Sequence, residues 1–134
     1  MTSSRRQAND AEALAVRIAD LALERKAENV VALDLRGISS ATDFFVIASG
    51  GSDVHVRAIA DHIVEELKKA DVRPGHVEGL QSGAWVLVDY IDVVVHVFQR
   101  SVRDFYQLEN LWGDAPTRDF EPEGPDAVAR QAGP

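Results

Sequence analysis

The sequence predicts an α/β domain, of the α+β kind, in which helices flank a mixed five-stranded sheet. Three segments place apolar residues at helical spacing, and five short runs are rich in Val, Ile and Phe. We expect a flexible N-terminus over residues 1–9, one domain over residues 10–112 and an acidic flexible tail over residues 113–134. The expected elements, in the order α-β-β-α-β-β-β-α, are a helix over 10–27, strands over 30–35 and 44–48, a helix over 52–70, strands over 76–78, 84–89 and 92–98, and a helix over 101–111.

Capping and turn signals delimit the elements of the first half. Asn9 or Asp10 can cap the first helix, whose apolar residues recur every three or four positions. The link between the two strands that follow is short for a crossover, which favours antiparallel pairing. Gly50-Gly51 ends the second strand, and Ser52 can cap the next helix, which carries one apolar stripe.

The second half begins with a turn at Pro74-Gly75 and a short strand. A strand, a helix and a strand in succession imply a right-handed parallel crossover. Two further strands close the sheet as a hairpin if the chain reverses at Tyr90-Ile91. Ser101 can cap the last helix, and Asp104 complements the positive end of its dipole.

The two closing strands predict one core face and one face suited to a partner. Side chains alternate between the faces of a sheet, so one face of this hairpin consists of valines and is expected to be core. The other face mixes an indole, aliphatic groups, carboxylates and an imidazole, a mixture typical of a protein interface. The expected cross-strand pairs on that face are Asp89–Asp92, Leu87–Val94 and Trp85–His96, with Phe98 beyond them.

Two alternatives for this face stay open at the level of sequence. The closing helix can cover it and satisfy its polar groups internally. The turn is also weakly specified, because Tyr90-Ile91 lacks the glycine or asparagine that two-residue hairpins prefer. A slip of one residue would exchange the two faces.

Composition excludes several classes of function. Fourteen basic and 22 acidic residues give a net charge of −8, without a basic cluster, so we expect little or no direct contact with nucleic acid. A partner in a nucleic-acid machine should be a basic protein. The chain has no cysteine and no apolar run long enough for a membrane span, and its first residues are not those expected of a signal peptide. We therefore expect a cytoplasmic protein.

The strongest indication of an enzyme is the loop Ser49-Gly-Gly-Ser-Asp53, placed between a strand and a helix where backbone N–H groups can cradle a phosphate. A nucleotidyltransferase also needs two adjacent carboxylates for magnesium, and Asp89 and Asp92 have the wrong spacing on one strand. The four histidines do not form a metal site. We therefore expect no catalysis, no metal and no cofactor.

Several ordered motifs stand out along the chain: Asp43-Phe-Phe-Val-Ile47, Ser49-Gly-Gly-Ser52, Ala58-Ile-Ala-Asp61, Glu78-Gly79, Trp85-Val-Leu-Val-Asp-Tyr90, Asp92-Val-Val-Val-His-Val-Phe98 and Arg103-Asp-Phe-Tyr-Gln-Leu-Glu-Asn-Leu-Trp112. Together these motifs resemble the ribosomal silencing factor family, also called RsfS or Iojap. The similarity runs from about residue 11 to residue 113.

The resemblance implies a nucleotidyltransferase-like fold that has lost catalysis. It implies that the chain binds the large ribosomal subunit through ribosomal protein L-fourteen, blocks association with the small subunit and represses translation when nutrients are limiting. It also implies that the chain can form a homodimer. The family's docking surface involves the stretch that here contains Trp85, Leu87 and Asp89.

The predicted partner-binding residues combine this stretch with the mixed face of the hairpin. One position departs from the family, since many members have glycine where this chain has Ile91. A nucleotide-handling enzyme and a homodimeric scaffold for another basic partner remain the alternative functions. The predicted residues are Trp85, Leu87, Asp89, Val94, His96 and Glu78.

Overall fold

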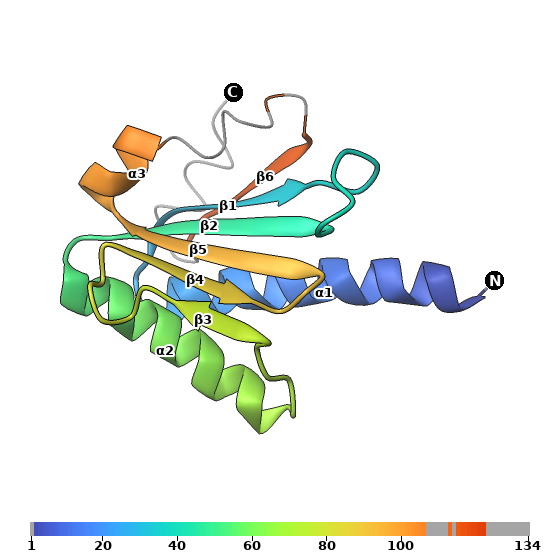
Figure 1. Ribbon diagram of the computed structural model, residues 1–134, viewed down its shortest axis with the longest axis horizontal. Coiled ribbons are helices and arrows are strands. Elements are labelled where there is room, and N and C mark those ends of the chain that lie inside the picture. Colours follow the sequence, from blue (N-terminus) through green and yellow to red (C-terminus); the bar gives the residue numbers. More distant parts are fainter. Residues whose placement is uncertain (1, 107–112, 114, 123–134) are drawn as a thin grey trace.

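The computed structural model describes residues 2–106, 113 and 115–122 (Figure 1). It forms an α/β fold in which a mixed six-stranded sheet, of order β3-β4-β5-β2-β1-β6, packs with three helices. The elements are α1 (Thr2–Glu24), β1 (Glu28–Asp34), β2 (Phe44–Gly50), α2 (Asp53–Lys69), β3 (His76–Glu78), β4 (Trp85–Asp89), β5 (Val93–Gln99), α3 (Arg100–Tyr106) and β6 (Thr117–Phe120).

The main core lies between the sheet and the two long helices. Figure 1 shows α1 and α2 on one side of the sheet and α3 on the other. The apolar stripe of α2 is buried except for Val64, which is half-buried, and Ser52 caps this helix as predicted, with its hydroxyl accepting the His55 N–H. The valines predicted as the core face of the hairpin are all buried against these helices: Val86, Val88, Val93, Val95 and Val97.

The directions of the strands follow the prediction in most respects. β1 and β2 pair antiparallel. β2 and β3 run in the same direction, but β4 and β5 lie between them, and the parallel neighbour of β2 is β5. The prediction did not find this β2–β5 pairing because a strand–helix–strand crossover gives the relative direction of its two strands. It does not say whether other strands lie between them.

β6 corrects two predictions: the sheet has six strands instead of five, and the segment predicted as a flexible tail contains a strand. This strand pairs antiparallel with β1 inside the segment expected to be flexible, and Ala115 just before it is buried. Phe120 packs against the main core, and the Arg118 guanidinium lies 4.7 Å from the centre of its ring. A short strand can form here because β1 would otherwise present an unpaired edge.

The helix ends also differ from the prediction. α1 begins at Thr2 instead of near residue 10, and Asn9 and Asp10 lie inside it. Arg5, Arg6, Gln7 and Ala8, which precede them, have high helix propensity. It ends at Glu24 because Lys26 adopts a left-handed conformation, with φ of 61°, and the Ala27 N–H returns to the Ala22 carbonyl. α3 starts at Arg100, so Ser101 lies in its first turn, and its predicted end near residue 111 lies outside the described residues.

The hairpin between β4 and β5 has a different register from the one predicted. Asp89 lies opposite Val94, not Asp92, because the chain reverses at Ile91-Asp92 and not at Tyr90-Ile91. The Asp89 carboxylate accepts the Ile91 N–H at 2.7 Å, which delays the reversal by one residue. The pairing therefore shifts by two positions, and an even shift leaves every side chain on its predicted face.

Candidate functional site

The mixed face of the hairpin lies on the side of the sheet opposite α1 and α2. Pairing places Leu87 opposite His96 and Asp89 opposite Val94, while β2 adds Phe45 beside Val94. We call the side of the sheet that carries these residues the groove face. Its residues near the β4–β5 turn are half-buried or exposed, apart from His96, so this end of the face is accessible.

A shallow groove of about 420 Å³ lies on this face, between the β4–β5 hairpin and the loop that joins β1 to β2. Apolar atoms provide most of its surface, and a carboxylate and an imidazole are its charged or titratable groups. An accessible apolar depression with few polar groups is typical of a binding site. The groove is lined by Ser39, Ala41, Thr42, Phe45, Leu87, Asp89, Ile91, Val94 and His96.

Four of the six predicted binding residues line this groove, and two lie outside it. Trp85 stands behind the groove on β4, where it is half-buried. Glu78 lies opposite Leu87 on the edge strand β3, exposed, with its carboxylate 3.1 Å from His76 Nε2. The structure therefore brings Leu87, Asp89, Val94 and His96 together, while Glu78 belongs to the outer rim.

His96 forms the floor of the groove and is held by its aromatic neighbours. Its Nδ1 accepts a hydrogen bond from Trp85 Nε1 at 3.1 Å, and its ring centre lies 4.6 Å from that of Phe45. Only 5% of the residue is exposed, and burial lowers the pKa of its imidazole to about 4. The ring is therefore neutral at pH 7, with its proton on Nε2, which has no hydrogen-bond partner among the described residues.

Trp85 marks the border between a covered part and an accessible part of the groove face. Its ring stacks on the buried Phe98 with 4.8 Å between centres, and both belong to a second apolar cluster that Val102 of α3 joins. The interpretation that the closing helix covers this face thus holds at the Phe98 end. It does not hold at the Leu87 end, where the side chains remain accessible.

Three aspartates lie at or beside the end of the groove at the β4–β5 turn. Asp89 lines the groove, and Asp92 is exposed in the turn. Asp43 lies close by, because its backbone N–H donates to the Asp92 carbonyl at 3.0 Å. An apolar groove with an acidic rim is complementary to an apolar surface surrounded by Lys and Arg.

Sequence reasoning missed part of the groove. The loop residues Ser39, Ala41 and Thr42 and the aromatic Phe45 line it together with Ile91. Alternation along residues 44–48 places Phe45 and Ile47 on one face, but the parallel pairing with β5 was needed to know which face that was. The loop residues carried no such signal, since their position depends on the hydrogen bonds of Asp43 and Phe44 to the turn.

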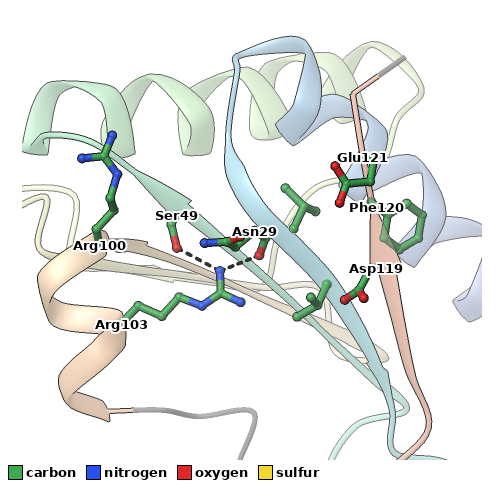
Figure 2. Close-up of a pocket in the computed structure, with 9 residues that line it drawn as sticks. Asn29, Ser49, Arg100, Arg103, Asp119, Phe120 and Glu121 are labelled. Carbon is green, nitrogen blue, oxygen red and sulfur yellow. Dashed lines mark hydrogen bonds between the residues drawn. The ribbon is translucent and has the colours of Figure 1, made fainter. Parts of the chain in front are cut away.

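A second cavity, of about 430 Å³, lies between α3, β2, β1 and β6 (Figure 2). Arg103 is buried beside it and donates from Nη1 to Ser49 Oγ at 2.9 Å and to the Asn29 carbonyl. Arg100 pairs with Glu28, which holds the pKa of that carboxyl below its ordinary value. Asp119 and Glu121 line the β6 side, so both signs of charge meet here.

The glycine loop next to this cavity uses its polar groups internally. The Gly51 N–H donates to His55 Nδ1 at 2.9 Å, and His55 Nε2 lies 2.8 Å from the Arg25 carbonyl. The Asp53 carboxylate pairs with Arg57. These bonds use groups that a phosphate cradle would present to its ligand, and they support the interpretation of the loop as a glycine turn with a serine cap.

Metal binding and membrane insertion are two further properties that the described part of the chain bears on. It contains no group of three or more His, Asp or Glu side chains placed to share a metal ion. None of its helices combines the length and the apolar character needed to cross a membrane.

Comparison with known proteins gives consistent similarities over most of the chain. A family model described as ribosomal silencing factor during starvation matches residues 8–133. The ribosomal silencing factor RsfS of Bacillus subtilis (strain 168) is 45% identical over 98 residues, which cover 73% of this chain and 83% of that protein. The chloroplastic protein Iojap of Arabidopsis thaliana is 35% identical over 111 residues, covering 80% of this chain and 45% of that protein. A crystal structure of a Chromobacterium violaceum protein matches with a TM-score of 0.70 at 37% identity, covering 78% of this chain and 85% of that one.

Proposed function

Because this chain belongs to the ribosomal silencing factor (RsfS/Iojap) family, whose members are non-enzymatic ribosome-binding regulators, we propose that it represses translation by docking on ribosomal protein L-fourteen of the large subunit. The bound chain prevents the small subunit from joining when nutrients are limiting. The observation that carries the proposal is the accessible apolar groove with an acidic rim, which contains four of the residues predicted to bind.

Leu87 and Val94 supply the apolar contact in this proposal. Both are half-buried in the free chain, so a partner can remove their remaining surface from water, which stabilises the complex. Trp85 acts mainly from behind the groove, since its indole holds His96 in place through the Nε1–Nδ1 hydrogen bond. Asp89 and the outer residue Glu78 face the basic side chains that surround the partner's apolar surface.

Repression by this route requires no chemistry. A 14.7 kDa body on the joining surface of the large subunit obstructs the small subunit sterically. The net charge of −8 also repels the RNA of an approaching small subunit, and little or no direct contact with nucleic acid is needed. We place this action in the cytoplasm of a bacterial cell, in line with relatives such as the one from Bacillus subtilis.

A homodimer is the second occupant that the groove supports. Two copies can cover each other's apolar grooves, as symmetric interfaces do, and docking on the ribosome would then require the dimer to separate. The aspartates around the groove oppose this arrangement, because they would face each other across the symmetric interface. We therefore propose the ribosomal protein as the main partner.

The experiment that tests the function is co-sedimentation of the purified chain with large ribosomal subunits. Leu87→Ala should weaken binding by about 2 kcal/mol, roughly thirty-fold, if Leu87 is a central anchor. Leu80→Ala is the matched control, since Leu80 is 37% exposed in the β3–β4 loop and does not line the groove. Equal losses for both variants, or none for Leu87→Ala, would remove the groove from the interface.

A further inference from the structure

Ile91 combines two properties that are unfavourable for folding. Its backbone has a φ of 76°, a conformation that is strained for a β-branched residue. Its side chain is 70% exposed, the largest exposure among the described large apolar residues, so it contributes little to the core. A polar residue or a glycine in this turn would avoid both costs.

Surrounding hydrogen bonds hold Ile91 in this conformation. The Asp89 carboxylate accepts the Ile91 N–H at 2.7 Å, and the Asp92 N–H donates across Ile91 to the Tyr90 carbonyl at 3.0 Å. The Asp92 carbonyl in turn accepts from the N–H groups of Asp43 and Phe44. The turn is therefore fixed by hydrogen bonds within the hairpin and by two from the start of β2, and the direction of the Ile91 side chain is fixed with it.

The position of Ile91 connects this strain to the groove. Ile91 lines the groove together with Leu87 and Val94, and it is the most exposed of these three aliphatic side chains. Asp89 and Asp92 flank it in sequence. A rigid apolar side chain that projects at the end of an apolar groove, between two carboxylates, has the form of an interface anchor.

We propose that Ile91 is a specificity-determining anchor, which inserts into an apolar recess of the docking partner whose border carries Lys or Arg. This inference rests on the proposed function, because the partner is the same large-subunit protein. The anchor extends the contact beyond Leu87 and Val94 to the tip of the hairpin. It also assigns a role to the turn strain, which holds the side chain in its binding position before the partner arrives.

The test separates binding from stability by a substitution that should change them in opposite directions. Ile91→Gly removes the side chain and accepts a positive φ without strain, so the melting temperature should rise by about 2 °C or more. The same variant should bind large subunits about tenfold more weakly, since the apolar contact is lost. Ile91→Val, which keeps a branched apolar side chain, should bind within about twofold of the unmodified chain.

Val54→Ala provides the control for removal of an exposed apolar side chain. Val54 is 65% exposed on α2, which packs on the opposite side of the sheet, so its loss should not change binding. Undiminished binding of Ile91→Gly by subunits that bind the unmodified chain would overturn the anchor and leave the proposed function intact. Weaker binding together with a lower melting temperature would also overturn it, because Ile91 would then be structural. Failure of the unmodified chain to bind would overturn the proposed function, and the anchor with it.

Discussion

Acidification from pH 7 to pH 4.5 is expected to destabilise the fold through His96. This residue is 95% buried, and burial lowers the pKa of its imidazole from the ordinary 6.5 to about 4. Between these two values the unfolded chain binds a proton at this position that the folded chain does not bind. The free energy of unfolding therefore falls as the pH falls below 6.5, and the loss is complete once the pH is below 4.

The size of the effect follows from the two pKa values. The difference between 6.5 and about 4 corresponds to about 3 kcal/mol of stability in full, most of which is lost by pH 4.5. Carboxylates such as Glu28 and Asp34, whose pKa values are lowered by hydrogen bonds from Arg100 and Arg36, lose their stabilising ion pairs only at lower pH. The histidine should consequently dominate this part of the acid range.

The assay compares urea unfolding at pH 7 and pH 4.5 for three forms of the chain. His96→Asn does not titrate, and its side-chain oxygen can accept the Trp85 indole hydrogen bond in place of Nδ1. It should be less stable at pH 7 but lose about 2 kcal/mol less on acidification than the unmodified chain. The control Val54→Ala, which removes an exposed apolar side chain on α2 and no titratable group, should leave the pH dependence unchanged. Equal losses for His96→Asn and the unmodified chain would refute the buried, neutral state of His96.

Two further substitutions test the packing around the site. Gly79→Ala should lower the free energy of unfolding by about 3 kcal/mol, since φ is +89° and a Cβ would lie 2.0 Å from the Trp85 carbonyl oxygen. Its control, Gly37→Ala, should lower it by only about 1 kcal/mol, because φ is +81° there but the space around the residue is open. Equal losses for the two variants would contradict the predicted clash. Phe120→Ala should lower the free energy of unfolding in urea by about 1–2 kcal/mol if β6 is a stable strand, because the half-buried ring packs on the core. An unchanged urea midpoint would show that β6 adds nothing to the stability of the fold.

The faces of the closing hairpin could be predicted from the sequence, but its register could not. Alternation alone identifies the buried valines and the mixed face, because the side-chain period of a strand is two. The register depends on the turn, and here the Asp89 carboxylate and the Asp43 and Phe44 N–H groups select Ile91-Asp92. An isoleucine at positive φ is not something that turn propensities favour, so local sequence rules point to the wrong residues.

The groove was predictable on its hairpin side and not on its loop side. Leu87, Asp89, Val94 and His96 follow from strand alternation, whereas Phe45 depends on the parallel pairing of β2 with β5, a contact between segments far apart in the chain. β6 was missed for a similar reason. Its four residues have little apolar content, and they form a strand because the edge of β1 accepts their backbone hydrogen bonds.

The most direct test of the central claim is an electron cryo-microscopy structure of the chain bound to the large ribosomal subunit. The groove face should lie against ribosomal protein L-fourteen, with Leu87, Ile91 and Val94 in the contact and α1 and α2 directed away from it. A complex in which α1 or α2 makes the contact, or in which the groove face remains exposed to solvent, would contradict the account.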